Sequence, residues 1–309
     1  MDLINKLPDR LLFGIPKKGR LYEHCLSLLR GADINFHRHN RLDIALVQNL
    51  PIALVFLPAA DIPKYVGEGN VDLGITGQDM VAESESGDKI EEILELGFGK
   101  CKLQVQVPVI GGASKVEELV GKRIVTSFEV LAEKYFDELD EKYLSEEQKK
   151  AGVRTKIEYV SGSVEAACAL GLADGIVDLV ESGETMKAAG LHPLSTVLST
   201  QAILICNKNP SNSSLVFKIA SRIKGVIAAQ KYVLLNYNVQ RVHLKEVTKV
   251  TPGSQAPTIS PLEDDEWVEV QSMVNKCEVA DIMDKLEEIG ARDILVFKID
   301  NCRVNSKSV

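Results

Sequence analysis

Short apolar runs alternate with amphipathic stretches through the first two-thirds of the chain. Many of these runs are apolar throughout, which is typical of strands in a sheet that helices cover on both faces. We expect strands at Leu11–Ile15, Leu42–Val47, Ala53–Leu57, Asp72–Thr76, Leu103–Val109, Arg123–Thr126, Ile157–Tyr159, Gly175–Val180 and Ala202–Cys206. Their alternation with helical patterns predicts an α/β fold in two lobes.

Two of the expected helices have recognisable starts. Thr126–Glu129 has the spacing of a capping box, and Leu131 and Tyr135 then follow one turn apart on one face. Ser163 can cap a second helix over Val164–Leu172.

Two segments are expected to connect the lobes. The run Lys102–Val107 is long enough to pass from one lobe into the other. A second crossing near Leu198–Leu204 would return the chain. Two such connections would leave a cleft between the lobes.

The order of expected strands and helices changes from about Arg222 onward. We expect strands at Tyr232–Asn236, Pro257–Pro261, Trp267–Met273 and Ile294–Ile299, with helices at Val239–Val250 and Val279–Ile289. The order βαββαβ is that of a small ferredoxin-like domain. Gly290 occupies the glycine position that commonly ends a helix. The polar tail 301–309 is expected to fray.

Composition narrows the class of partner. The 309 residues suggest about two domains, with room for a small third. Apolar residues make up 45% of the chain and charged residues 26%, as in a globular protein. Thirty-six Lys and Arg against 44 Asp and Glu give a net charge of −8, which argues against nucleic acid as the main partner. Small phosphorylated ligands need only local cations and amides, so they remain allowed.

The cysteines and the amino terminus favour a cytoplasmic protein. Cysteines 25, 101, 168, 206, 277 and 302 form no CxxC pair, and the first four lie in apolar segments, so we expect reduced, mostly buried thiols. Met1–Lys6 has no apolar signal-peptide region, and the run Ile52–Leu57 is too short to cross a bilayer.

The stretch Asp174–Met186 carries the strongest chemical signal. An apolar strand ends in a polar turn, and a helix is expected to begin at Met186. Ser182 and Thr185 supply hydroxyls, and Gly183 permits close approach of the backbone. Amides at the start of a helix then favour an anion such as phosphate. A plain capped turn explains the same residues.

Two acidic side chains beside a phosphate would repel it, so their presence requires a separate function. Asp178 or Glu181 could bind sugar hydroxyls or a Mg²⁺ ion.

Pro16–Arg20 places three cations directly after the first strand, and its alternative reading is a solvated basic loop. Gly69–Gly77 and Ser161–Glu165 are weaker candidates for backbone or phosphate contacts.

Other kinds of site lack support in the sequence. The histidines at 24, 37, 39, 192 and 243 have no zinc-ligand spacing, and His37 and His39 are expected to form a surface pair. The sequence contains no GxSxG, HExxH, GxxxxGK[ST] or GxGxxG motif.

Ten positions in one order carry a resemblance to the ATP phosphoribosyltransferases. They are Glu165, Gly171, Ala173, Ile176, Asp178, Leu179, Ser182, Gly183, Thr185 and Met186. Further family-like segments lie at 16–21, 71–77, 124–128, 161–165 and 251–262, and the NCRV near the end is similar to fungal members. The resemblance spans nearly the whole chain and is that of the long form.

The resemblance implies a fold and a set of domain bounds. The fold is a bilobal catalytic core like that of periplasmic binding proteins, followed by a ferredoxin-like regulatory domain. The expected bounds are 1–104 with 198–220 for the first lobe, 105–197 for the second lobe and 221–309 for the regulatory domain.

The resemblance also implies a reaction. The family joins N1 of ATP to C1 of phosphoribosyl pyrophosphate and releases pyrophosphate with Mg²⁺, as the first step of histidine biosynthesis. Asp178 and Glu181 would then act on the ribose side as catalytic residues. The loop holding the phosphoribosyl group would comprise Asp178, Leu179, Val180, Glu181, Ser182, Gly183, Glu184 and Thr185. ATP and pyrophosphate would contact Lys17, Lys18, Arg20, Asp72, Ser161, Gly162, Ser163 and Glu165.

The family further implies regulation and assembly. L-Histidine would inhibit by binding the last domain, between subunits of a homohexamer whose dimers exchange. Positions that match the surroundings of that ligand are Asn238, Ser254, Thr258, Met273 and Asp293. The Mg²⁺ ligands are not assigned, and no general base is named because adenine N1 is already a lone-pair nucleophile.

Two alternatives belong to other functional classes. A non-enzymatic small-molecule receptor could use the same bilobal scaffold, since a fold does not fix function. A regulatory subunit of another enzyme is the third reading. The intact loop Asp178–Thr185 argues against both.

Overall fold

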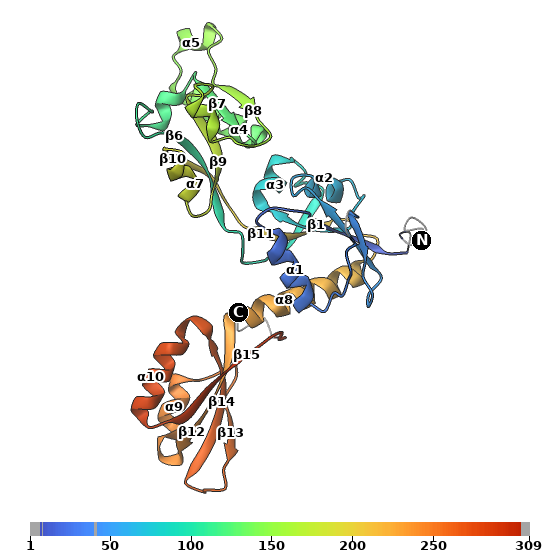
Figure 1. The fold of residues 1–309 in the computed structure, drawn as a ribbon, viewed down its shortest axis with the longest axis vertical. Helices are drawn as coiled ribbons and strands as arrows, with labels where there is room; N and C mark the ends of the chain where they lie inside the picture. The colour runs from blue at the N-terminus through green and yellow to red at the C-terminus, as the bar shows by residue number, and fades with distance from the viewer. Residues whose placement is uncertain (1–6, 8, 40–41, 304–309) are drawn as a thin grey trace. The chain divides into compact units, whose positions relative to one another are not determined.

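The computed structural model describes residues 7, 9–39 and 42–303 (Figure 1). These residues form two compact units, one drawn from residues 7–25 and 36–216 and the other from residues 26–35 and 217–303. The described part of the first unit contains two sheets, and that of the second contains one. The bounds expected for two lobes and a regulatory domain stay a prediction.

The first sheet has six strands in the order β2-β3-β1-β4-β11-β5. The strands are β1 (Leu11–Pro16), β2 (Ile44–Leu46), β3 (Ile52–Leu57), β4 (Leu73–Gly77), β5 (Ile90–Glu95) and β11 (Ala202–Asn207). Strands β3, β1 and β4 are parallel, so they end at one edge of the sheet. Strand β11 runs antiparallel to β4 and therefore begins at that same edge, beside Gly77.

Three helices accompany the first sheet. They are α1 (Tyr22–Gly31), α2 (Ile62–Gly67) and α3 (Gln78–Glu83). Ile62 and Val66 of α2 are fully buried against Ile203 and Ile205 of β11. The apolar runs that predicted these strands therefore supply the core, as burial of a sheet face under a helix requires.

The second sheet has five strands in the order β10-β6-β9-β7-β8. The strands are β6 (Cys101–Pro108), β7 (Arg123–Thr126), β8 (Lys156–Tyr159), β9 (Gly175–Val180) and β10 (Leu191–Thr200). The helices around it are α4 (Glu129–Tyr143), α5 (Glu146–Lys150), α6 (Ala166–Ala169) and α7 (Glu184–Ala188). Phe136 of α4 packs on the Val177 face of β9, whereas Met186 of α7 packs on the Ile176 face.

The chain passes between the two sheets twice. It leaves the first sheet after β5 and joins the second at Cys101, so the first passage occupies residues 96–100. The crossing expected near Lys102–Val107 lies a few residues earlier, because Lys102–Val107 already pair with β9 and β10. The second passage is at Gln201, between β10 and β11, inside the expected Leu198–Leu204.

The third sheet confirms the ferredoxin-like domain. Its order is β13-β14-β12-β15 and all its pairs are antiparallel. The elements are β12 (Tyr232–Gln240), α9 (Leu244–Val250), β13 (Thr258–Pro261), β14 (Trp267–Asn275), α10 (Val279–Ile289) and β15 (Arg292–Lys298). Both helices pack on one face of this sheet, and Gly290 ends α10 in the left-handed region with φ 101°.

Several expected bounds differ from the observed ones. The first strand of the last domain continues to Gln240, because Val233, Leu235, Tyr237 and Val239 are buried with the period of two that defines a strand face. The expected helix from Val239 therefore begins only at Leu244. Strands β5 and β10, which the sequence patterns missed, are the outer strands of their sheets.

Both expected helix caps are wrong. Helix α4 begins at Glu129 with Phe128 as its N-cap residue, and the Thr126 hydroxyl instead accepts a hydrogen bond from Phe128 N (2.9 Å) and donates one to Val177 O (2.7 Å). Helix α6 starts at Ala166, and Ser163 has a left-handed φ of 53° that is incompatible with helix entry there. Neither serine nor threonine side chain therefore caps the helix expected of it.

All six cysteines are free thiols, and Cys25, Cys101 and Cys206 are buried as expected. Cys168 is half-buried and Cys277 is exposed. Within residues 7, 9–39 and 42–303, no helix combines the length and apolarity needed to span a bilayer. Met1–Lys6 and most of the polar tail lie outside the described residues.

Candidate functional site

A cavity of about 560 Å³ lies where the two sheets of the first unit meet. At this point β9 and β10 end and β6 begins, with Lys102 opposite Val180 and Cys101 opposite Thr200. The lining residues are Gln78, Lys100, Cys101, Lys102, Gln104, Val180, Glu181, Ser182, Gly183, Met186, Lys187, Ser199, Thr200 and Gln201. The cavity therefore joins the end of one sheet to both connections between the sheets.

The turn predicted to bind phosphate borders this cavity. Val180, Glu181, Ser182 and Gly183 line it, whereas Glu184 and Thr185 are exposed beyond the lining. Gly183 has φ 78°, in the left-handed region that a glycine adopts without strain. The Ser182 hydroxyl accepts a hydrogen bond from Glu184 N at 3.4 Å.

Helix α7 differs from the expected one in start and length. It begins at Glu184, two residues before Met186, and has 5 residues. So short a helix adds little dipole to the turn, because the macrodipole grows with the number of aligned peptide units. Any anion here must rely mainly on hydroxyls, single amides and nearby cations.

Three lysines that the sequence reasoning missed supply those cations. Lys100 and Lys102 flank the start of β6, and Lys187 lies on α7, one turn after Gly183. They come from two chain segments and line one cavity. The available signal was the alternation of Lys102, Gln104 and Gln106 with apolar residues, which marks a strand with one polar face.

The basic loop after β1 reaches the same region through Arg20. Its guanidinium donates a hydrogen bond to Gly99 O at 2.7 Å, in the segment that leads to Lys100. Burial raises the pKa of the Cys101 thiol; Arg20 opposes this effect, and the carboxylates of Asp79 and Glu181 add to it. Arg20 and Glu181 therefore act electrostatically on one lining residue. Lys17 and Lys18 do not line the cavity.

Neither Asp178 nor Glu165 lines the cavity, although Asp178 lies on β9 two residues before the lining residue Val180. Asp178 is half-buried, and its carboxylate accepts a hydrogen bond from Leu179 N at 2.8 Å. Burial raises the pKa of Asp178, and the negative charge of Glu165 raises it further. Val164 packs against Ile176, which holds the turn Ser161–Glu165 along β9. Ser161, Gly162 and Ser163 are exposed in this turn.

Asp72 does not line the cavity as expected. It lies immediately before β4, at the end opposite Gly77. Its carboxylate accepts hydrogen bonds from Leu12 N (2.9 Å) and Ser211 N (2.8 Å). The side chain therefore ties neighbouring segments of the first sheet together at the edge opposite the cavity.

The start of α3 is hydrogen-bonded to Thr200 and Gln201, at the second connection between the sheets. Asp79 is 1% exposed, and its N–H donates to the Thr200 hydroxyl at 3.0 Å. The same hydroxyl donates to the Asp79 carboxylate at 2.7 Å, and Gln78 N donates to Gln201 O at 3.1 Å. A Cβ at Gly77 would collide with that carboxylate, so the close approach requires glycine.

The positions expected to bind histidine fall into two groups in the second unit. Ser254, Thr258 and Met273 line a cavity of about 350 Å³. Asn238 and Asp293 lie outside that lining and are bonded to each other, from Asn238 Nδ2 to Asp293 Oδ2 at 3.1 Å.

A Mg²⁺ ion would have one obvious carboxylate at the first cavity. No group of three or more His, Cys, Asp or Glu side chains within the described ranges is arranged to hold a metal ion. Mg²⁺ commonly binds through one or two carboxylates together with substrate phosphates. Glu181, in the cavity wall, fits that pattern.

Comparisons with known proteins identify the family of the chain. The family model described as ATP phosphoribosyltransferase matches residues 58–225, and the model for its C-terminal domain matches residues 229–301. The chain is 60% identical to the ATP phosphoribosyltransferase of Schizosaccharomyces pombe and 57% identical to that of Saccharomyces cerevisiae. Both alignments cover 98% of this chain and 100% of the relative.

A solved structure supports the fold at greater distance. The ATP phosphoribosyl transferase (HisG:HisZ) complex from Thermotoga maritima contains a chain with a TM-score of 0.58 and 24% identity. The match covers 71% of this chain and 98% of that chain, and at this identity it bears on the fold alone. With both family models matched in order and relatives aligned end to end, the chain belongs to the ATP phosphoribosyltransferase family.

Proposed function

We propose that the protein transfers the 5-phosphoribosyl group of phosphoribosyl pyrophosphate to N1 of ATP. The products are N1-(5-phosphoribosyl)-ATP and pyrophosphate, and the reaction is the first step of L-histidine biosynthesis. The observation that carries the proposal is the complete family loop, Asp178–Thr185, beside a cavity lined by three lysines in a chain of this family.

The loop and the lysines suit the two ends of the sugar substrate. Ser182 and Gly183, with Thr185 next to them, would hold the 5-phosphate through hydroxyls and amides. Lys100, Lys102 and Lys187 would face the pyrophosphate. Ammonium groups are point charges that attract phosphate without fixed geometry, as a departing group requires.

Charge stabilisation and alignment account for the chemistry. The bond from C1 to the pyrophosphate oxygen breaks with its electron pair on the oxygen, and the lone pair of adenine N1 forms the new bond to C1. Positive charge develops on the ribose, where Asp178 and Glu181 would stabilise it, and negative charge develops on the pyrophosphate beside the lysines. No base has to remove a proton from N1, so positioning both substrates is the main task.

Mg²⁺ would belong with the pyrophosphate. Bound there, the ion supplies further positive charge for the leaving group. Glu181 is the side chain of this chain that would hold it, with the remaining positions taken by phosphate oxygens and water.

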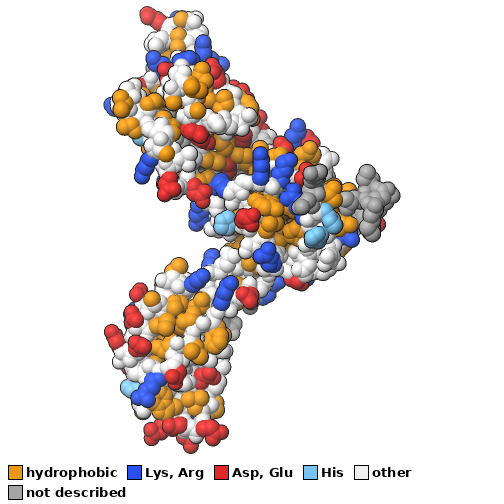
Figure 2. Space-filling model, in the orientation of Figure 1, with side chains coloured by type: hydrophobic (Ala, Val, Ile, Leu, Met, Phe, Trp, Pro, Cys, Tyr) orange, Lys and Arg blue, Asp and Glu red, His pale blue; other side chains and the backbone are white. Residues whose placement is uncertain are grey.

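The acidic balance of the chain is compatible with two polyphosphate substrates. On the face drawn in Figure 2, basic side chains are interspersed with acidic ones and form no single large basic patch. The positive potential that this proposal needs is local, from three lysines around one cavity and Arg20 close by.

Regulation by L-histidine is part of the proposal. The support is the cavity lined by Ser254, Thr258 and Met273, three of the positions that the resemblance implied. Inhibition requires that histidine bind a less active state more tightly than an active one. The homohexamer and the cytoplasmic location stay predictions.

Turnover tests the proposal directly. The purified protein is mixed with ATP, phosphoribosyl pyrophosphate and Mg²⁺, with pyrophosphatase to draw the reaction forward and no histidine. We expect an adduct whose mass is that of ATP plus one phosphoribosyl group. Absence of the adduct would contradict the proposed function.

A further inference from the structure

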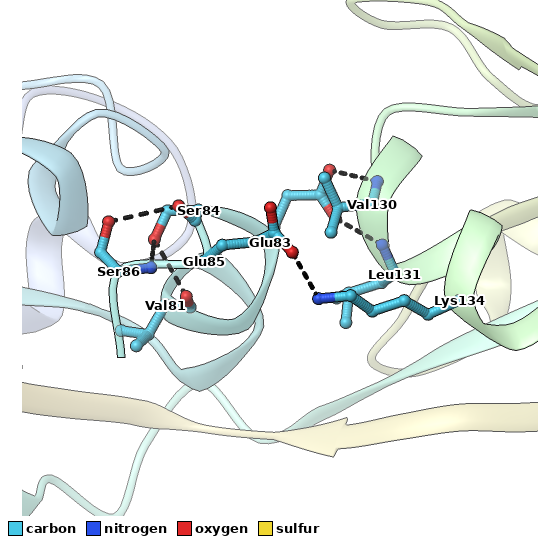
Figure 3. Close-up of polar contacts among 8 residues, drawn as sticks. All are labelled: Val81, Glu83, Ser84, Glu85, Ser86, Val130, Leu131 and Lys134. Atoms are coloured by element: carbon cyan, nitrogen blue, oxygen red, sulfur yellow. Dashed lines mark hydrogen bonds and ion pairs between the residues drawn. The ribbon is translucent and has the colours of Figure 1, made fainter. Parts of the chain in front are cut away.

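The first turn of α4 is capped from outside its own sheet. Glu83, the last residue of α3, places one carboxylate oxygen 2.9 Å from Val130 N and the other 3.0 Å from Leu131 N (Figure 3). Helix α3 leads out of β4 of the first sheet, whereas α4 follows β7 of the second. One side chain therefore ties the two sheets of the first unit together, on an element that ends away from the cavity.

The physical reasons for this contact are clear. The first amides of a helix have no partner within the helix, and the N-cap residue Phe128 offers no side-chain acceptor. A carboxylate at that position satisfies two amides and complements the dipole of the 15-residue helix. Burial raises the pKa of Glu83 and the charge of Glu129 adds to the rise, while the hydrogen bonds from the α4 amides lower it.

A neighbouring ion pair provides a natural comparison. Lys134 Nζ lies 2.7 Å from Glu85 Oε1, two residues after Glu83, and the two side chains are 59% and 60% exposed. Figure 3 shows both contacts passing from the α3 segment to α4. Exposed pairs of this kind contribute little, because water and salt screen them and two flexible side chains lose entropy.

Helix α3 is attached at both ends. Its first residues, Gln78 and Asp79, bond Gln201 and Thr200 at the second connection between the sheets. Its last residue holds α4. The helix has 6 residues, so it is a short rigid element between these attachments. Gln78 also lines the cavity, which links the same element to the site.

The start of α4 is connected to the substrate loop (Glu181–Thr185) by one hydrogen bond and by strand β9. Thr126, just before α4, donates its hydroxyl hydrogen bond to Val177 O of β9. Strand β9 leads directly into the loop Glu181–Thr185. On the first sheet, Arg20 and Gln78 lie at the edge where β1 and β4 end.

We propose that Glu83 is a positioning residue that fixes α4 against α3 and so sets the substrate loop of the second sheet against the facing edge of the first. The proposal rests on the proposed function for its kinetic part only. Glu83 does not line the cavity, so in this proposal it acts through α4, β7 and β9. Its loss leaves each half of the site intact but lets the halves vary in separation.

The test compares Glu83→Ala and Glu83→Gln with Glu85→Ala as the matched control. Hydrogen exchange is followed in peptides covering residues 129–133, and kcat and KM are measured for both substrates. In Glu83→Ala we expect faster exchange of the Val130 and Leu131 amides and a kcat lower by about tenfold, which corresponds to about 1.4 kcal/mol. KM should change by less than about twofold, because misalignment costs the transition state more than ground-state binding.

The remaining variants keep the test decisive. Glu83→Gln retains one acceptor oxygen and should fall between wild type and Glu83→Ala in both measurements, even if the alanine variant folds poorly. Glu85→Ala should match wild type. Unchanged exchange in Glu83→Ala, or faster exchange with wild-type kcat, would overturn the proposal. A wild-type protein without turnover would instead overturn the proposed function and leave the exchange result to stand by itself.

Discussion

Asp79 and Thr200 hold each other by two hydrogen bonds at the point where the chain returns from the second sheet to the first. Asp79 N donates to the Thr200 hydroxyl at 3.0 Å, and that hydroxyl donates to the Asp79 carboxylate at 2.7 Å. The residues are 1% and 4% exposed. Both adjoin the cavity, because Gln78 and Thr200 are part of its wall.

Replacing Thr200 by valine should destabilise the first unit. The change keeps the shape of the side chain but leaves the buried Asp79 carboxylate and its N–H without the hydroxyl, at a cost of about 2–3 kcal/mol. Denaturant unfolding measures the loss. Thr196→Val, on the same strand, removes only a surface hydrogen bond from Gln104 and should cost less than about 0.5 kcal/mol. Equal losses would show that the buried pair has no special weight.

Removing a lysine from the cavity wall should weaken use of phosphoribosyl pyrophosphate. Lys102→Ala and Lys187→Ala each delete a positive charge beside the proposed pyrophosphate position. We expect kcat/KM for this substrate to fall by about tenfold or more for each, as for a lost hydrogen bond to a charged group. Lys150→Ala, on α5 and outside the lining, is the charge-matched control. A similar loss in the control would point to net charge instead of position.

Removing both hydroxyls of the loop should separate the two substrates. The double variant Ser182→Ala, Thr185→Ala deletes hydroxyls that are assigned to the 5-phosphate of phosphoribosyl pyrophosphate. ATP is assigned to other residues. Binding of phosphoribosyl pyrophosphate, measured by titration calorimetry, should weaken by about tenfold or more, while ATP binding changes little. Equal weakening for both ligands would contradict the assignment of the loop.

The pH dependence of the rate should respond to Glu165. Burial and the Glu165 charge raise the pKa of Asp178, so Asp178 takes up a proton at a higher pH than an ordinary aspartate does. If ionised Asp178 stabilises the ribose, the rate falls on the acid side as it protonates. Glu165→Gln removes one cause of the raised pKa, so the acid limb should move to lower pH. A limb that stays in place or moves upward contradicts this role.

The same shift has a consequence for stability with a defined sign. Because the folded-state pKa of Asp178 is raised, its contribution to stability is complete below the unfolded value of 3.8 and is lost as the pH rises through the folded value. Asp178→Asn should therefore unfold at higher denaturant concentration than wild type above that window, and no differently below it. Urea midpoints at several pH values provide this comparison.

Histidine sensitivity should depend on the small cavity of the second unit. Thr258→Ala and Met273→Ala change its wall and should raise the histidine concentration needed to halve the rate. Asn238→Ala changes a residue that bonds Asp293 outside that wall and should have a smaller effect. The opposite order would move the ligand toward the Asn238–Asp293 pair.

The parts of the fold that could be predicted are those governed by local pattern. Strands β7 and β9 and helix α10 have the bounds that their apolar runs and Gly290 indicated. Strands β5 and β10 were missed because outer strands carry charged and polar residues that break the apolar pattern. Val239 shows how buried alternation extends a strand into an expected helix.

The site was predictable only where it is continuous in sequence. The residues of the turn after β9 predicted a phosphate site, but the lysines at 100, 102 and 187 come together through the pairing of β6 with β9 and β10. Asp72 has a suitable carboxylate, but it lies at the end of β4 opposite the cavity, where it accepts a hydrogen bond from Leu12 N. The cap on α4 comes from Glu83, 47 residues before Val130, so no local capping motif could reveal it.

The central claim is that phosphoribosyl transfer takes place at the cavity where the two sheets join. The most direct measurement is the initial rate of formation of the N1 adduct, from ATP and phosphoribosyl pyrophosphate with Mg²⁺, by wild type and by a Lys102→Ala, Lys187→Ala double variant. We predict turnover by wild type and a rate at least about tenfold lower for the variant; because both lysines face one pyrophosphate, their separate losses are not expected to multiply. Turnover that is undiminished in the variant, or no adduct from wild type, would contradict the claim.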